Sequence, residues 1–162
     1  TIHSLQDLKG KVFAFTDPLS YSGHMAVEAY LREKNSIPEK FFSRYFYTYS
    51  HDKSIWAVAN KIADGASFDS QIYEYAKEKT PELTAKVRII ESIGSAPTGP
   101  IVINKKIKPE QKEQLRRIFL TMHENFEASE AMQGLVIDKF IMPNPELYTP
   151  LRNLYDRTSV IL

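Results

Sequence analysis

Apolar runs and amphipathic stretches alternate through the first half of the chain. Runs at residues 11–15, 44–49, 65–69 and 86–92 are rich in β-branched and aromatic residues and predict four strands. Apolar periodicity predicts helices at about 25–34 and 70–79, with a third around Ile55, Val58, Ala59 and Ile62, which recur at helical spacing. Strands and helices that alternate across short turns indicate an α/β fold with a short, mostly parallel sheet.

The pattern changes near Ser95, where a segment rich in proline and glycine begins. A brief strand is predicted at 100–104, and from Pro109 onward only helices are expected. The first has one apolar face, the second spans about 128–138, and the third spans about 145–157. The face of the first helix consists of Leu115, Ile118, Phe119 and Met122, and that of the third of Leu147, Leu151 and Leu154. We therefore predict an α/β ligand-binding lobe at residues 1–93, and a crossover and helical segment at 94–162.

Polar residues follow the first three predicted strands at the point where a helix begins. In an open parallel sheet these turns lie together at the carboxyl edge, where ligands bind. Helix N-termini present free N–H groups that attract anions. Candidate ligand-binding residues are Ser20, Tyr21, Ser22, Gly23, His51 and Asp69. The Asp69 carboxylate suits an oxyanion that carries its own acidic proton, because it would accept that proton in a hydrogen bond.

Each of these residues also has a structural interpretation. Ser22, Asp52 and Ser70 are typical helix caps, and so is Asp69. Trp56 adjoins the core positions and is expected to pack there. A hydrolase triad assembled from Ser20 or Ser22 with His51 and Asp69 is disfavoured, because Asp69 would then have to orient the histidine instead of facing the ligand. No nucleotide-binding, zinc-protease or serine-hydrolase motif occurs, so we predict no enzyme.

Composition narrows the function classes further. The chain has 162 residues, a net charge of +1 and no cysteine. Its balanced charge argues against nucleic acid as a partner, and the lack of cysteine excludes disulfides and cysteine-based zinc sites. His3, His24 and His123 have no partner at metal-ligand spacing, so neither a metal nor a cofactor is expected. No apolar run is long enough to span a membrane, and the first residues lack the pattern of a signal peptide.

Several ordered segments are similar to those of the phosphate-, phosphite- and phosphonate-binding proteins of ABC transporters. They are SLQDLKGKVFAFTDPLSYSG, IPEKFF, SHDKSIWAVANKIADGASFDS and RIIESIGSAPTGPIVI. The resemblance implies one lobe of a periplasmic binding protein of type II, located in the periplasm, with Ser20, Tyr21, Ser22 and His51 around the oxyanion and Asp69 near the hinge. Tyr21 stands where the family often has a small residue, so a narrower pocket is expected.

The resemblance also implies partners. A transport protein would deliver phosphonate, phosphite or phosphate to a membrane permease. The alternative is the ligand-sensing domain of a signalling receptor, such as a histidine kinase or a cyclase, built on the same fold. Because the family has two lobes, this chain is expected to hold the second lobe and the return to a truncated first lobe. The exposed apolar faces of the helical segment would then favour a homodimer.

Overall fold

The computed structural model describes residues 2–155 of the chain, which form two compact units. The first unit contains the residues up to Ser95 together with helix α8 (Thr149–Tyr155), and the second contains Ala96–Tyr148. Helix α8 therefore groups with the α/β unit, whereas the sequence assigned it to the segment 94–162. The two units are described separately below.

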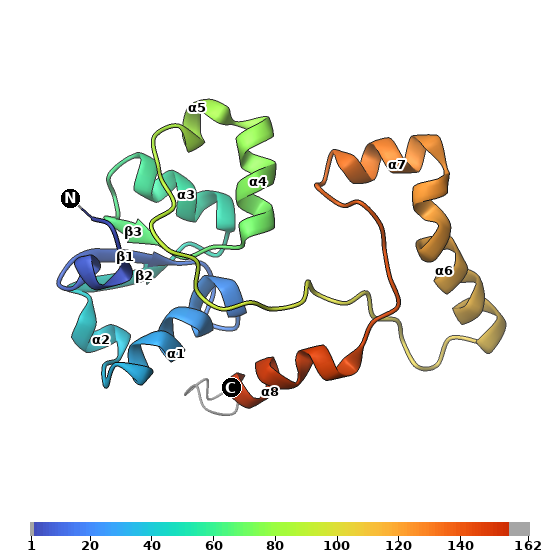
Figure 1. The fold of residues 1–162 in the computed structure, drawn as a ribbon, viewed down its shortest axis with the longest axis horizontal. Helices are drawn as coiled ribbons and strands as arrows, with labels where there is room; N and C mark the ends of the chain where they lie inside the picture. Colours follow the sequence, from blue (N-terminus) through green and yellow to red (C-terminus); the bar gives the residue numbers. More distant parts are fainter. Residues whose placement is uncertain (1, 156–162) are drawn as a thin grey trace. The chain divides into compact units, whose positions relative to one another are not determined.

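A three-stranded parallel sheet forms the centre of the first unit (Figure 1). Its strands are β1 (Val12–Phe15), β2 (Arg44–Tyr47) and β3 (Gly65–Ala66), in the order β2-β1-β3. Phe13 lies opposite Tyr45 on one side and Gly65 on the other. The predicted parallel α/β arrangement is confirmed, although each strand is shorter than its apolar run.

The two faces of the sheet bury side chains of different size. Phe13 and Phe15 point to one face, where they pack with residues of helices α1 (Ala26–Glu33) and α2 (Pro38–Phe41). Ala14 points to the other face and packs against Ala57 of helix α3 (His51–Ala59). Figure 1 shows α1 and α2 on one side of the sheet. Helices α3, α4 (Ser70–Lys79) and α5 (Pro81–Thr84) lie on the other side. Burial of each large aromatic contributes about 1.5–3 kcal/mol, whereas the small alanines let α3 approach the sheet closely.

The predicted fourth strand at residues 86–92 is wrong, because this segment has no regular secondary structure beyond a turn at Lys86 and joins no sheet. It lies along the N-terminal segment instead. The Glu91 carboxylate accepts a hydrogen bond from the Leu5 N–H at 2.9 Å, and the Arg88 guanidinium donates to the Ile2 carbonyl. Ile90 and Ile93 pack against the core around Phe13. The apolar run thus reflects burial by side-chain packing without strand pairing. The predicted strand at 100–104 likewise has no regular secondary structure and no sheet partner among the described residues.

Helix α3 ends earlier than its apolar periodicity suggested. Ile55 is fully buried as predicted, but the helix stops at Ala59, and Lys61 takes a left-handed backbone conformation with φ of 60°. Ile62 therefore lies beyond the helix and is 44% exposed. Trp56 is 50% exposed, which corrects the expectation that it packs in the core.

The second unit consists of helices and extended segments. Helix α6 (Pro109–Thr121) leads through a short 3-10 turn, η3 (Met122–Glu124), to α7 (Phe126–Gln133), and a further 3-10 turn, η4 (Pro145–Tyr148), ends the unit. Phe119 meets Phe140 edge to face with ring centroids 5.2 Å apart, and Met132 is buried.

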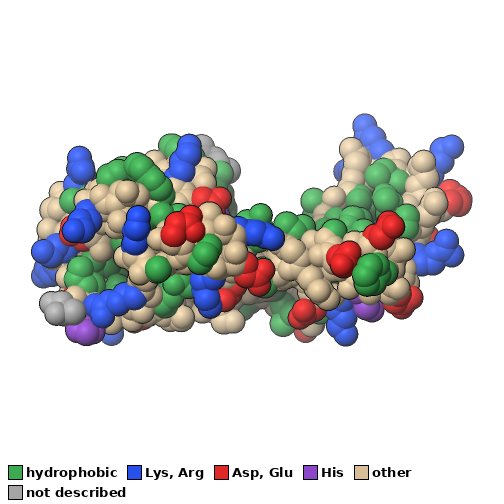
Figure 2. All heavy atoms as spheres, turned by 90° about the horizontal axis from the view of Figure 1, so that it is seen from above, with side chains coloured by type: hydrophobic (Ala, Val, Ile, Leu, Met, Phe, Trp, Pro, Cys, Tyr) green, Lys and Arg blue, Asp and Glu red, His purple; other side chains and the backbone are tan. Residues whose placement is uncertain are grey.

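The predicted helices of the C-terminal part differ in extent from those observed. The second was expected to run to residue 138 but ends at Gln133, and the third is divided into η4 and α8. Its predicted last two residues, 156 and 157, lie outside the described residues. Large apolar side chains remain at the surface of the second unit among charged ones (Figure 2), including Val102 at 81% exposure and Phe126 at 75%. No helix within residues 2–155 is long and apolar enough to cross a bilayer.

Candidate functional site

Three turns leave the carboxyl ends of the three parallel strands, and each begins a helical segment. The first follows β1 and enters a single π-helical turn, η2 (Tyr21–Met25), which continues into α1. The second leads from β2 to α3, and the third from β3 to α4. In the strand order β2-β1-β3, the chain leaves β1 toward one side to form β2 and then crosses to the other side of β1 to form β3. Such a switch point is where open α/β sheets bind ligands.

Ser20 caps the first turn. Its Oγ accepts a hydrogen bond from the Gly23 N–H at 3.0 Å, and its carbonyl accepts the π-type bond from the Met25 N–H. The sequence had assigned the cap to Ser22, so the helical segment begins earlier than predicted. As a cap, Ser20 uses an oxygen lone pair and retains its hydroxyl proton for donation. The Ser22 hydroxyl donates to the Asp69 carboxylate instead of capping this turn.

Gly23 is required by packing in the interior. A Cβ at this position would lie 2.5 Å from the Thr16 Cβ and 2.9 Å from the Ser20 Oγ. Its N–H donates to Ser20, and its carbonyl accepts from the Thr16 N–H and the Ser67 hydroxyl. The absence of a side chain therefore makes room for Thr16, and its role in ligand binding stays a prediction.

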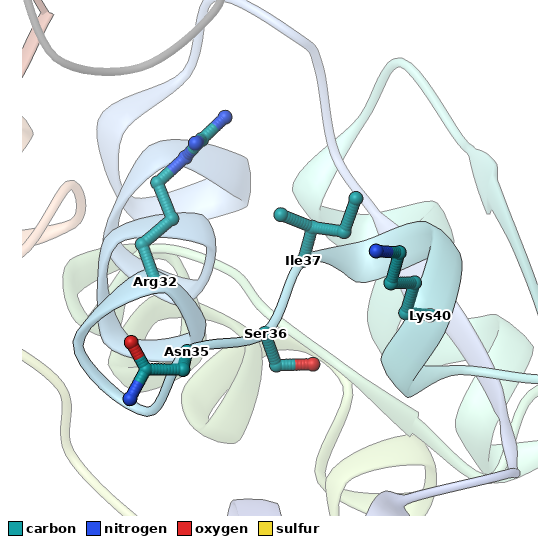
Figure 3. Close-up of a pocket in the computed structure, with 5 residues that line it drawn as sticks. All are labelled: Arg32, Asn35, Ser36, Ile37 and Lys40. Atoms are coloured by element: carbon teal, nitrogen blue, oxygen red, sulfur yellow. The ribbon is translucent and has the colours of Figure 1, made fainter.

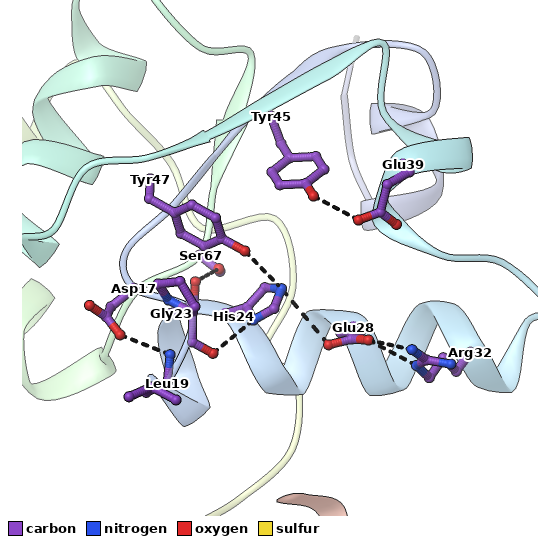
Figure 4. Close-up of polar contacts among 11 residues, drawn as sticks. Asp17, Leu19, Gly23, His24, Glu28, Arg32, Glu39, Tyr45, Tyr47 and Ser67 are labelled. Atoms are coloured by element: carbon purple, nitrogen blue, oxygen red, sulfur yellow. Dashed lines mark hydrogen bonds and ion pairs between the residues drawn. The ribbon is translucent and has the colours of Figure 1, made fainter. Parts of the chain in front are cut away.

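His24, which the sequence argument did not use, holds the same turn from inside the protein (Figure 4). The residue is 8% exposed, and its Nδ1 lies 3.0 Å from the Pro18 carbonyl oxygen. A carbonyl can only accept, so Nδ1 carries the proton. Nε2 then accepts from the Tyr47 hydroxyl at 3.3 Å. Burial, with the nearby Glu28 carboxylate, raises the pKa of Tyr47 to about 12, so this hydroxyl keeps its proton at neutral pH.

Glu28 continues this buried network along α1. Its Oε1 accepts two hydrogen bonds from the Arg32 guanidinium, at 2.7 and 2.9 Å, while its Oε2 lies 3.8 Å from His24 Nε2. A buried carboxylate is tolerated because the guanidinium provides both charge and donors. The network fixes the position of helix α1 relative to the turn that carries Ser20. A signal for it was present in the sequence, since His24, Glu28 and Arg32 recur every four residues.

His51 begins helix α3 after the cap residue Ser50, whose Oγ accepts from the Lys53 N–H. Its Nδ1 lies 3.0 Å from the Asp69 backbone nitrogen, which donates its N–H. Nδ1 must therefore be unprotonated, and in the neutral ring the proton sits on Nε2. Burial lowers the pKa of His51, and the nearby carboxylates of Asp69 and Asp52 offset only part of that effect. His51 thus presents a neutral ring with an N–H donor at Nε2.

Asp69 joins the third turn to the first. One carboxylate oxygen accepts from the Gln71 N–H at 2.8 Å and so caps α4, which makes Asp69 the cap in place of the predicted Ser70. The other oxygen lies 3.5 Å from the Ser22 hydroxyl. The structure therefore brings Ser22, His51 and Asp69 together, as the sequence predicted. Their ligand-binding role stays a prediction.

The Tyr21 side chain reaches Gly94, close to the end of the first unit's continuous segment. Its hydroxyl occupies the space that a side chain on Gly94 would need, and Gly94 has a left-handed φ of 71°. The phenol therefore packs on the backbone of the crossing segment. The expectation that Tyr21 narrows the pocket stays a prediction.

The geometry does not support a catalytic triad. In such a triad the acid accepts a hydrogen bond from the Nδ1–H of the histidine. Here the backbone N–H of Asp69 donates to Nδ1 of His51, so the polarity is reversed. No group of three or more metal-ligating side chains occurs within the part of the chain that the structure describes.

A separate pocket of about 220 Å³ lies between the end of α1 and the start of α2 (Figure 3). It is lined by Arg32, Asn35, Ser36, Ile37 and Lys40. Helix α1 runs from the carboxyl end of β1 to the start of β2, so this pocket lies at the amino edge of the sheet. It is therefore distinct from the three turns.

Comparisons with known proteins point to one family. The family model for the periplasmic substrate-binding protein of ABC phosphonate transporters matches residues 1–148. The phosphonates-binding periplasmic protein of Escherichia coli (strain K12) is 27% identical over 157 residues, which are 94% of this chain and 46% of that protein. This chain thus spans about half the length of that relative.

Solved structures agree. The binding-protein component of an ABC phosphonate transporter from Pseudomonas aeruginosa matches with a TM-score of 0.86 and 30% identity, over 96% of this chain and 53% of that one. PhnD1 from Prochlorococcus marinus (MIT 9301), in complex with methylphosphonate, matches with a TM-score of 0.75 over 96% of this chain and 62% of that one. At 15% identity, the second match supports the fold alone.

Proposed function

Because this chain belongs to the family of periplasmic substrate-binding proteins of ABC phosphonate transporters, we propose that it binds a small tetrahedral oxyanion for delivery to a membrane permease. A phosphonate is the first candidate, and phosphite and phosphate share its chemistry. The binding site is the junction of the three turns at Ser20–Ser22, His51 and Asp69. The observation that carries the proposal is that Asp69 contacts the other two turns, with its carboxylate 3.5 Å from the Ser22 hydroxyl and its backbone N–H bonded to His51 at 3.0 Å.

The donors at this junction suit an anion. Helices α3 and α4 and the π-helical turn all begin there, and their first N–H groups and their dipoles favour negative charge. The Ser20 hydroxyl and the Nε2–H of His51 add two donors, and the Ser22 hydroxyl would add a third by turning from the Asp69 carboxylate to the ligand. Because these groups are neutral, the site would bind its ligand by hydrogen bonds without a full positive charge.

Asp69 defines which protonation state of the ligand fits. A carboxylate repels a fully deprotonated oxyanion but accepts a strong hydrogen bond from an O–H group. A phosphonate, phosphite or phosphate that retains one acidic proton satisfies this condition. Sulfate does not, since it carries no proton near neutral pH. We therefore propose that the site selects oxyanions with at least one hydroxyl.

Calorimetric titration of the protein with methylphosphonate, phosphite, phosphate and sulfate tests the proposal. The first three should include at least one ligand, and sulfate should not bind. Replacement His51→Ala, or Ser20→Ala with Ser22→Ala, should weaken binding by about 1.5–3 kcal/mol for each charge-assisted hydrogen bond lost. Asp69→Asn should admit sulfate, because the amide can donate where the carboxylate only accepts.

His3→Ala and Ser129→Ala are the matched controls, since both residues lie outside the three turns. They should bind like the unaltered protein. Equal affinity for sulfate and the protonated oxyanions, or unchanged binding by all three site variants, would contradict the proposal.

A further inference from the structure

Thr16 occupies the point where the three turns meet beneath the candidate site. It is the first residue after β1 and is 4% exposed. Its Oγ1 lies 3.1 Å from the Ser67 carbonyl oxygen, 3.2 Å from the Ser54 Oγ and 3.4 Å from Nδ1 of His51. Its Cβ fills the space that Gly23 leaves open. One side chain thus contacts the turns that follow β1 and β3 and the start of helix α3.

The hydrogens around Thr16 can be assigned from the acceptors. A carbonyl oxygen only accepts, so the Thr16 hydroxyl donates to Ser67. Nδ1 of His51 already accepts the Asp69 N–H, and the Thr16 oxygen lies on the same side of the ring. The Asp69 N–H is therefore the contact that keeps Nδ1 unprotonated, while the Thr16 oxygen, whose proton goes to Ser67, packs beside Nδ1 without donating to it.

Packing alone does not explain a hydroxyl here. Valine has the same shape as threonine and would fill the space beside Gly23 equally well. A buried hydroxyl costs free energy unless it is hydrogen-bonded, and this one is bonded to the segment that carries Asp69. The bond to Ser67 holds the backbone two residues before Asp69, and so fixes the N–H that meets His51.

We propose that Thr16 is a positioning residue of the oxyanion site, which holds His51 as a neutral ring with Nδ1 turned inward and the Nε2–H free for the ligand. The ligand part of this inference rests on the proposed function, whereas the state of the ring does not. Burial lowers the pKa of His51, which agrees with a neutral donor. His24 shows the opposite arrangement, with its proton on Nδ1, because its Nδ1 faces a carbonyl oxygen where that of His51 faces an N–H.

Three variants of the protein separate positioning from packing. Thr16→Val removes the hydroxyl and keeps the shape, while Thr16→Ser keeps the hydroxyl. Thr84→Val is the matched control, because Thr84 is 6% exposed and its hydroxyl also donates to a backbone carbonyl, that of Pro81, away from the site. Nitrogen-15 NMR of the His51 ring reports which nitrogen is protonated, and calorimetry with methylphosphonate reports affinity.

In Thr16→Val the Nδ1 signal of His51 should move, and methylphosphonate affinity should fall about three- to tenfold, the equivalent of one neutral hydrogen bond. Thr16→Ser should restore both, and Thr84→Val should change neither. An unaltered ring signal in Thr16→Val, or an equal loss of affinity in Thr84→Val, would overturn the inference. If the unaltered protein binds no oxyanion, the proposed function fails and the ring signals still decide the role of Thr16.

Discussion

Gly23 shows how a single residue determines the geometry of the first turn. The chain passes so close to Thr16 that a Cβ would overlap the Cβ of that side chain at 2.5 Å. Both partners lie on ordered backbone, so neither can move far. We therefore expect Gly23→Ala to lower the free energy of unfolding by about 1–3 kcal/mol, the usual cost of overpacking a core.

Urea unfolding followed by circular dichroism measures this change. Gly134→Ala is the control, because Gly134 has helical backbone angles and a Cβ there would meet the nearest atom at 3.4 Å. Its stability should stay the same or rise by up to about 1 kcal/mol. An equal response of the two variants would mean that the contact with Thr16 is not the reason for the glycine.

Some residues of the site were visible in the sequence and others were not. Ser22, His51 and Asp69 lie in the turns that follow the three strands, so their position at one edge could be predicted from the parallel alternation of strands and helices. The roles of Thr16 and His24 could not be found this way, although Thr16 directly follows β1, because each acts through a partner distant in sequence. Thr16 meets Ser67, and His24 meets Tyr47. Such pairs can be recognised only in the folded structure, where the sheet brings their elements side by side.

At the scale of the elements, helix starts depend on which side chain reaches the first free N–H groups. The sequence offered two adjacent candidates, Asp69 and Ser70, for helix α4, and the structure uses Asp69. We expect Asp69→Ala to destabilise the protein by about 1 kcal/mol through loss of the cap. Asp69→Asn should be nearly neutral, because asparagine caps equally well, and Ser70→Ala should have no effect.

Thermal unfolding of the three variants without ligand measures these differences. Because Asp69→Asn preserves the cap and removes the charge, any effect of that variant on oxyanion binding is separate from helix stability. A loss of stability in Ser70→Ala equal to that in Asp69→Ala would place the cap at Ser70 after all.

The elements were predicted best where apolar periodicity and strand composition agreed. Helix α4 matches its predicted bounds, and β1 and β2 lie within their apolar runs. The strand predicted at 86–92 is wrong, because strand propensity indicates only that side chains suit a half-buried surface. It does not indicate whether a neighbouring strand or other packing buries them. Ile90 is covered by the core around Phe13, while Glu91 and Arg88 bond to the N-terminal segment.

At the scale of the molecule, the two units have separate cores. The first is built around Phe13 and Phe15, and the second contains Met132 and the ring pair Phe119 and Phe140. All residues of the proposed binding site belong to the first unit. A bound ligand raises the free energy only of those opening reactions that disrupt its binding site. Its effect should therefore be confined to the cooperative unit that holds the site.

Hydrogen exchange with and without methylphosphonate tests this expectation. At a ligand concentration of about 100 times Kd, the slowest amides of β1, α1 and α3 should exchange up to roughly one-hundredfold more slowly. Amides of α6 and α7 should be unchanged, and at the same ligand concentration His51→Ala should reduce the protection in the first unit to about tenfold or less. Equal protection of α6 and α7 would mean that both units open together, and the site would then have to be treated as part of a single cooperative structure.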